Sequence, residues 1–220
     1  MSQTSPAWRA VLLAGGRSSR MGTDKALLPW GNGTLLTHMR GMLIDAGAVE
    51  VVVSGDRPDV GGVSDATRDT GPMGALSQLA SRLTDGTWIV VPVDMPLLST
   101  DLLQALLSVD AACACVEGHP LPMMLRVDDG MRALMHAVGA RAGRERSLRA
   151  LQQDIGTQHL PAARWQQALR NCNTPEEWIA LQQTVIQADS ESRSGLVVQV
   201  MDQIRMAGVQ NISIAADKSS

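Results

Sequence analysis

The sequence predicts an α/β fold in which helices cover a mostly parallel β-sheet. Short apolar runs bounded by glycine or proline alternate with longer stretches of helical period, which is the pattern of consecutive βαβ units. The 220 residues are 45% hydrophobic, enough for one sizeable domain with a deep ligand cleft. We expect strands at residues 10–14, 49–54, 62–66, 87–93, 111–116, 123–127 and 155–160.

Helices are expected between these strands, and residues typical of helix ends mark where they begin and stop. Thr34 predicts the start of a helix over residues 35–46, with Gly47 as its stop. A second helix is expected over residues 74–83, after Pro72.

Two later helices carry acidic or proline residues in their first turn. A helix over residues 100–107 has Asp101 there, where a carboxylate suits the helix dipole. Thr174, followed by Pro175, predicts an N-cap with proline at the first helical position. We expect this last helix to run to about residue 183.

The chain is expected to divide into a main domain, residues 1–183, and a C-terminal appendage, residues 184–220. In the appendage a strand-like run at 184–188 precedes a helical pattern at 195–207 and a second strand-like run at 211–215. This strand–helix–strand unit follows a domain whose βαβ pattern is already finished.

The composition excludes several classes of partner. The net charge is −3, and no basic run offers a footprint for nucleic acid or an anionic membrane. All aromatic content is five Trp residues, so stacking of bases on Phe or Tyr is ruled out. Cys113, Cys115 and Cys172 form no Cys-x-x-Cys pair and no even framework. Without a secretion signal or an apolar run that could span a bilayer, we expect a cytoplasmic protein.

A glycine-rich loop follows the first expected strand and is the most informative segment. It matches neither the P-loop nor Gly-x-Gly-x-x-Gly, but paired glycines let backbone N–H groups approach a phosphate or a base edge. Arg20 and Lys25 supply the positive charge that a triphosphate needs. The alternative is a solvated turn with surface cations. The residues expected to contact a nucleotide at the start of this loop are Leu13, Ala14, Gly15 and Gly16.

Asp94 is the strongest candidate metal ligand. It follows an apolar strand, and open α/β sheets bind ligands at the carboxyl ends of their strands. A carboxylate there can hold Mg²⁺, which uses one or two carboxylates together with substrate phosphates. The alternative, a cap for the following helix, suits Asp101 better. Asn173 has two alternative roles: its amide oxygen assists the metal site, or it is a turn residue.

Four segments together resemble the motifs of the MobA-like nucleotidyltransferases. They are residues 13–25, the Gly-Pro-Met-Gly-Ala run at 71–75, Val-Pro-Val-Asp-Met-Pro at 91–96, and Asn-Cys-Asn-Thr-Pro-Glu at 171–176. The similarity covers about residues 8–183. It implies a Rossmann-like three-layer nucleotidyltransferase fold, and its Leu-Ala-Gly-Gly and Asp-Lys elements resemble members that transfer guanylyl groups.

The resemblance implies a reaction. GMP would pass from Mg·GTP to the terminal phosphate of molybdopterin or its molybdenum-loaded form, with release of pyrophosphate and formation of a guanine dinucleotide cofactor. Such a transfer needs positioning and charge neutralisation rather than a protein nucleophile. Lys25 and Arg20 would stabilise charge on the phosphates and Asp94 would hold Mg²⁺. The alternatives are a cytidylyltransferase, a sugar-phosphate nucleotidyltransferase, or a non-catalytic nucleotide-binding homologue.

Some positions match the family less closely. Asp65 matches the family aspartate that contacts the nucleotide, with Asp69 as a rival in the same loop. Ser54, which is also expected to contact the nucleotide, stands where the family often has asparagine, and Gly74-Ala75 reverses the family's Ala-Gly order. These two departures favour the alternative of a non-catalytic homologue.

The acceptor side and the appendage give weaker signals. Arg144 and Arg146 resemble the family's pterin-facing segment, or else belong to a solvated helix start, and His119 before proline is interpreted as a turn residue rather than a general base. Residues 184–215 resemble the last strand–helix–strand of ExbD/TolR-type membrane proteins, without their transmembrane helix. The appendage is therefore either a means of self-association into a homo-oligomer or a fusion remnant.

Overall fold

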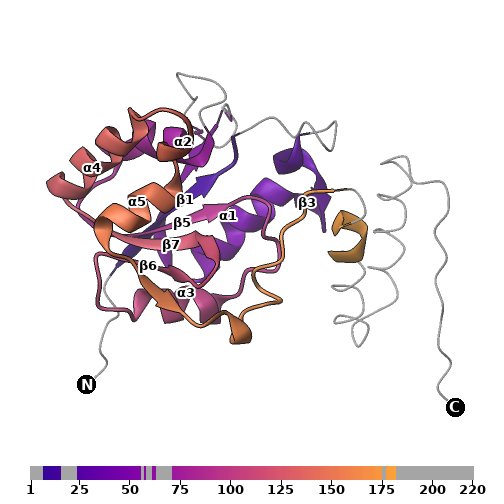
Figure 1. Cartoon of the computed structure of the whole chain (residues 1–220). Coiled ribbons are helices and arrows are strands. Elements are labelled where there is room, and N and C mark those ends of the chain that lie inside the picture. The colour runs from indigo at the N-terminus through magenta and orange to yellow at the C-terminus, as the bar shows by residue number, and fades with distance from the viewer. Residues whose placement is uncertain are drawn as a thin grey trace, which may run out of the picture. The chain divides into compact units, whose positions relative to one another are not determined.

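The computed structural model describes residues 7–15, 24–55, 57, 61–62, 71–174 and 177–181 (Figure 1). The chain separates into two compact units, Met1–Asn171 and Cys172–Ser220. The expected strand at 62–66 and the appendage at 184–220 lie outside the described residues, apart from Gly62, which is not in a strand. The division at residue 183 therefore remains a prediction.

A six-stranded sheet forms the centre of the first unit. β1 pairs in parallel with β4 and β5, and β6 pairs in parallel with β8, whereas β7 runs antiparallel to both of its neighbours. The prediction of a mostly parallel sheet is thus confirmed. In spatial order the strands are β4 (Ala48–Ser54), β1 (Trp8–Leu13), β5 (Gly86–Pro92), β7 (His119–Val127), β6 (Cys113–Val116) and β8 (Gln158–Leu160).

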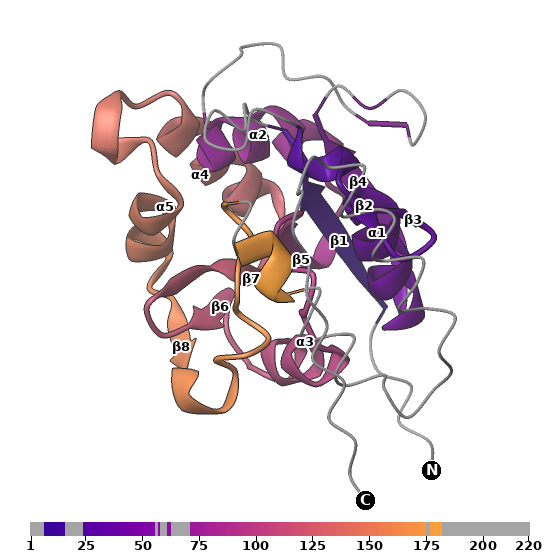
Figure 2. The same ribbon diagram turned by 90° about the vertical axis from the view of Figure 1, so that its right-hand side faces the viewer.

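Helices cover both faces of this sheet (Figures 1 and 2). α2, α4 and α5 share one apolar core with β1, β5, β6 and β7, and α1 and α3 cover the other face. Short 3₁₀ turns and a two-stranded ribbon connect the layers. The helices are α1 (Leu35–Asp45), α2 (Gly71–Leu79), α3 (Thr100–Leu107), α4 (Asp129–Gly139) and α5 (Leu148–Ile155); the ribbon is β2 (Pro29–Trp30) with β3 (Gly33–Thr34); the turns are η1 (Lys25–Leu27), η3 (Ala80–Arg82), η4 (Gly143–Glu145) and η5 (Ala162–Arg164).

The predicted helix ends agree with the capping geometry. Thr34 Oγ1 accepts a hydrogen bond from Thr37 N and the Thr37 hydroxyl accepts one from Thr34 N, which is a reciprocal capping box. Within the second unit, Glu177 Oε2 accepts from Thr174 N at 3.2 Å while Glu177 N donates to Thr174 Oγ1 at 3.2 Å. Thr174 is therefore an N-cap, as predicted.

Three elements differ most from the sequence-based expectation. β7 begins at His119, four residues before the expected start, and His119 is a strand residue rather than a turn residue. The last strand is shortened to Gln158–Leu160 because α5 continues through Ile155 and ends at Gly156, which has a left-handed conformation with φ 77°. The second helix begins at Gly71, three residues early, and tightens into η3 after Leu79.

The core is built without Phe or Tyr, from aliphatic residues, Met and Trp. Trp88 is fully buried and its indole N–H donates to the Thr84 carbonyl at 2.8 Å. Cys113 and Cys115 are buried free thiols in β6, and burial raises the pKa of Cys113 to about 12 and that of Cys115 to about 11. Both thiols are thus kept neutral. Among the described residues, no helix has the length and apolarity needed to cross a membrane.

α2 and α4 pack in such close contact that one glycine is required between them. A Cβ on Gly139 would lie 2.2 Å from Ser77 Oγ and 2.3 Å from Ser77 Cβ. Gly41, inside α1, is the opposite case, because a Cβ there meets nothing within 4 Å.

These two helical glycines give a matched pair of stability predictions. Gly139→Ala is expected to lower the free energy of unfolding by about 1 to 3 kcal/mol, because the helices must move apart. Gly41→Ala is expected to raise it by about 0.5 to 1 kcal/mol, because alanine loses less backbone entropy on folding. Urea unfolding followed by circular dichroism measures both; equal and small effects would contradict the close packing.

Candidate functional site

Three loops meet where β1, β4 and β5 end. Ala14 N donates to the Ser54 carbonyl at 3.0 Å, which ties the end of β1 to the end of β4. Val93 N donates to the Leu13 carbonyl at 3.0 Å, which ties the end of β1 to the end of β5. The carboxyl ends of parallel strands are where open α/β sheets bind ligands. This edge is therefore the candidate functional site.

Lys25 and Asp94 form an ion pair at this edge. Lys25 Nζ lies 3.0 Å from Asp94 Oδ2, and the two side chains are only 18% and 19% exposed. Asp94 is the second residue after β5, and Lys25 is the first residue of η1. Two residues predicted from separate motifs are thus brought together, 69 positions apart in the chain.

Asp24 fixes where Lys25 stands. Its Oδ1 accepts a hydrogen bond from Ala26 N at 3.0 Å, so that Asp24 is the N-cap of η1. The Asp24 carboxylate also binds Arg57, whose Nη2 lies 2.7 Å from Oδ1 and whose Nη1 lies 2.6 Å from Oδ2. This is a bidentate pair, the geometry in which arginine binds a carboxylate best.

Arg57 is a residue of this site that the sequence reasoning missed. Its Nη2 also donates to the Ala14 carbonyl at 2.9 Å, so one guanidinium joins the glycine loop to the Asp24 turn. Its side chain is 14% exposed, and its Nε has no hydrogen-bond partner within the described part of the chain. An unpaired buried donor costs about 1 to 3 kcal/mol. The one available signal was its position three residues after β4, at the same sheet edge.

Gly55 allows the loops after β1 and β4 to approach one another. Its φ is +119°, a conformation that other residues rarely adopt. A Cβ at this position would lie 3.0 Å from Gly15 N and 3.2 Å from the Ala14 carbonyl carbon. Glycine is therefore needed at position 55 for the peptide between Ala14 and Gly15 to lie where it does.

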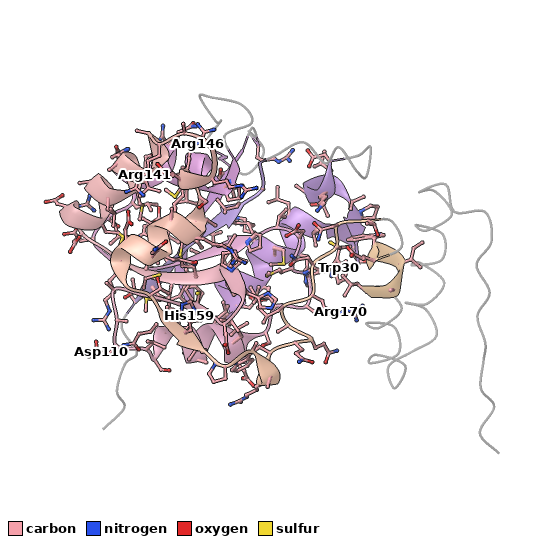
Figure 3. The ribbon with its side chains drawn as sticks, viewed as in Figure 1. Trp30, Asp110, Arg141, Arg146, His159 and Arg170 are labelled. Carbon is pink, nitrogen blue, oxygen red and sulfur yellow. The ribbon has the colours of Figure 1, made fainter. Side chains whose placement is uncertain are left out.

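α1 and the β2–β3 ribbon support the loop that follows Asp94. His38, on α1, places Nε2 3.1 Å from the Pro96 carbonyl oxygen. The Trp30 ring lies 5.3 Å from the His38 ring, centre to centre, on the side of the molecule where β3 and α1 lie (Figure 3). This contact thus supports the chain at Pro96, two residues after the metal-binding candidate Asp94.

The other predicted site residues fall into two groups. Leu13 and Ala14 are buried at the end of β1, Gly15 is exposed, and Ser54 is fully buried with its carbonyl bonded to Ala14 N. Gly16, Arg20, Asp65 and Asp69 lie outside the described residues, and Asn173 belongs to the second unit.

The candidate acceptor residues lie on two further segments. Because β7 is antiparallel to β5, with Val90 opposite Met123, the amino end of β7 at His119 lies at the same sheet edge as Asp94. Arg144 is exposed in η4 and Arg146 is half-buried between η4 and α5 (Figure 3). The register thus places His119 at the edge that carries Asp94. The start of α5, just after Arg146, reaches the same end of β7, because Arg149 Nη2 donates to the Gly118 carbonyl at 3.4 Å.

The residues at this edge fit a magnesium ion. Within the described ranges no group of three or more His, Cys, Asp or Glu side chains forms a ready-made metal cage. Mg²⁺ does not need one, because it takes one or two carboxylates and completes its shell with water and substrate phosphates. The Asp94 carboxylate already faces a cation, the Lys25 ammonium group at 3.0 Å. The same carboxylate can bind a metal ion in place of this lysine, so the two cations compete for it.

Comparison with known proteins gives a family and several relatives. The family described as MobA-like NTP transferase domain matches residues 10–169. A molybdenum cofactor guanylyltransferase from Xanthomonas euvesicatoria pv. vesicatoria is 47% identical over 177 residues, which cover 79% of this chain and 94% of that protein. A second protein of that name, from Pseudomonas entomophila, is 32% identical over 192 residues, covering 80% of this chain and 98% of that one.

Solved structures show the same fold at low sequence identity. A nucleotidyl transferase from Methanothermobacter matches with a TM-score of 0.66 and 16% identity, covering 83% of this chain and 99% of that chain. A 2-C-methyl-D-erythritol 4-phosphate cytidylyltransferase from Thermus thermophilus matches with a TM-score of 0.54 and 18% identity, covering 80% and 98%. Nucleotidyltransferases with little sequence identity to this chain thus share its architecture.

The Lys25–Asp94 pair predicts a competition between lysine and metal. Lys25→Ala is expected to raise the affinity for free Mn²⁺, measured by electron paramagnetic resonance without nucleotide, by about fivefold or more. The reason is that a unit charge at this distance is worth about 1 kcal/mol even in water. Lys25→Arg is the charge-preserving control, and Lys25→Ala combined with Asp94→Asn should lose the gain. An affinity unchanged in Lys25→Ala would contradict the competition.

Proposed function

The chain belongs to the MobA-like NTP transferase family, and from this membership we propose that it transfers GMP from Mg·GTP to molybdopterin or the molybdenum cofactor. The product is a guanine dinucleotide form of the cofactor, released with pyrophosphate. The observation that carries the proposal is the similarity to the Xanthomonas guanylyltransferase, which extends over nearly the whole of that protein. The Lys25–Asp94 pair at the carboxyl edge of the sheet supports it independently.

The reaction is an in-line displacement at phosphorus. An oxygen of the acceptor's terminal phosphate forms a bond to the α-phosphorus of GTP. The bond from that phosphorus to the oxygen that bridges the α- and β-phosphates breaks, and its electrons leave with pyrophosphate. Protein residues position the two phosphates and neutralise their charge, and no covalent intermediate on the protein is required.

We assign the charged residues of the site as follows. Lys25 binds the α-phosphate and the departing pyrophosphate, where an ammonium group placed in advance stabilises the charge that develops. Arg20 adds a second cation from the glycine loop. Asp94 holds Mg²⁺, which neutralises phosphate charge when it is bound. The buried pairing of Lys25 with Asp94 supports these roles, because it keeps both groups at one spot before substrate arrives.

The nucleotide is held mainly by backbone. We propose that the N–H groups of residues 13–16 contact the base and phosphates, that Asp65 accepts hydrogen bonds from the guanine edge or the ribose, and that Ser54 lies behind the loop. Ser54 is fully buried and its carbonyl accepts a hydrogen bond from Ala14 N, which favours support of the loop over the direct nucleotide contact expected from the sequence.

The alternative functions have less support. A cytidylyltransferase shares the fold, but the Thermus enzyme is only 18% identical to this chain, which is too little to assign its substrate to this protein. A non-catalytic homologue would explain Ser54 and the Gly74-Ala75 order. The intact ion pair between Lys25 and Asp94 speaks against it.

Pyrophosphate release tests the function directly. With molybdopterin as acceptor, release is expected from Mg·GTP and not from CTP, UTP or ATP, and GTP should give the largest thermal stabilisation. Asp94→Ala should remain folded and lose this release by about a hundredfold or more, because removal of one charge-stabilising group costs on that order. Unchanged turnover of Asp94→Ala, or equal release from CTP, would overturn the assignment.

We also propose that residues 184–220 mediate self-association and that the enzyme works in the cytoplasm. The apolar helical pattern at 195–207 supports the first proposal, and the three free thiols suit the reducing conditions of the second. Deletion of residues 185–220 is expected to reduce the mass measured by light scattering to that of a monomer. An oligomer of unchanged size would show that the appendage is not the interface.

A further inference from the structure

We propose that Arg57 is a positioning residue for the transferase reaction, acting on Lys25 through Asp24 and on the glycine loop through the Ala14 carbonyl. The inference rests on the proposed function, since it assigns a role within that same site. It starts from one guanidinium that makes three short hydrogen bonds, two to Asp24 and one to Ala14.

The first effect of Arg57 is on the lysine. Asp24 both caps η1 through Ala26 N and accepts the bidentate pair from Arg57. Lys25 follows Asp24 directly and extends to Asp94, 3.0 Å away. Without the guanidinium, the Asp24 carboxylate would be free to rotate out of its cap. The backbone that carries Lys25 would then lose its fixed position relative to Asp94.

The second effect is on a backbone donor of the glycine loop. The Ala14 carbonyl and the Gly15 N–H belong to one planar trans peptide unit, so they point in opposite directions. Arg57 Nη2 holds that carbonyl, and Gly55 lies against the same peptide with no side chain between them. The Gly15 N–H is therefore aimed away from Arg57. An oriented backbone N–H is the kind of donor that binds phosphate or a base edge.

Arg132 provides a matched control. It is 19% exposed, against 14% for Arg57, and it binds Asp85 and Asp129 at 2.6 Å and the Leu83 carbonyl at 2.9 Å. It thus joins chain segments through two carboxylates and one carbonyl, as Arg57 does through one carboxylate and one carbonyl. Its segments lie beside the amino end of β5, the opposite end of that strand from Asp94. Arg132→Ala therefore measures the loss of stability caused by removing such an arginine far from the site.

The test compares Arg57→Ala, Arg57→Lys, Asp24→Asn, the double variant Arg57→Ala with Asp24→Asn, and Arg132→Ala. Each is measured for kcat and KM in pyrophosphate release, for Mg·GTP affinity by calorimetry, and for urea unfolding. Arg57→Ala and Asp24→Asn are each expected to lower kcat by about tenfold or more, because small displacements of catalytic groups are costly. The double variant should be no slower than the slower single variant, since both substitutions remove the same Arg57–Asp24 contact.

The remaining variants separate positioning from stability. Arg57→Lys should not restore kcat, because an ammonium group cannot bind both carboxylate oxygens and the carbonyl together. Arg132→Ala should unfold at a lower urea concentration than the wild type but keep its kcat, KM and affinity for Mg·GTP. An Arg57→Ala enzyme with wild-type kcat per folded molecule, or a double variant whose losses multiply, would overturn the proposal.

The design also distinguishes failure of this inference from failure of the proposed function. If the wild-type enzyme releases no pyrophosphate with molybdopterin, the function is wrong, and Arg57 is then judged by binding. In that case Arg57→Ala and Asp24→Asn should still weaken Mg·GTP by about tenfold relative to wild type. Affinity equal to that of Arg132→Ala would then overturn the role of Arg57.

Discussion

The parallel pairing of β1 between β4 and β5 is the constraint on which the site depends. Ala10, Val11 and Leu12 are fully buried, so β1 has no freedom to shift within the sheet. Because the three strands run the same way, their following loops meet at one edge, where hydrogen bonds from Ala14 N and to the Leu13 carbonyl join them. Residues from three distant segments of the chain are thus placed together before any ligand binds.

Charges at this edge alternate in sign from one loop to the next. The Arg57 guanidinium after β4 binds Asp24, the adjacent Lys25 binds Asp94 after β5, and each contact is 3.0 Å or shorter. These two ion pairs balance each other's charges in the free protein while they hold separate positive and negative groups ready. A triphosphate with its metal also carries both signs, so it can exchange partners with this chain without leaving a buried charge unpaired.

Much of the fold could be predicted because buried parallel strands are continuous apolar runs. The run at 87–93, for example, matches β5 to one residue at each end. The start of β7 could not be predicted, because Pro120 and Pro122 argue against a strand. Pairing with β5 begins only at Met123, which leaves the prolines beyond the reach of that neighbour. Lys25 and Asp94 could be found because each stands in a motif at a strand end. Arg57 could not, since its meaning comes from a carboxylate 33 positions away.

The absence of Phe and Tyr also determines how this protein can be observed. With five indoles as its only aromatic side chains besides histidine, its ultraviolet emission comes from Trp alone. Trp88 is sealed in the core, but Trp30 lies against His38, which binds the loop just after Asp94. The same contact that supports the metal-binding candidate therefore connects an intrinsic fluorophore to the site. The emission of Trp30 is therefore expected to respond to changes at this loop, without tyrosine emission in the background.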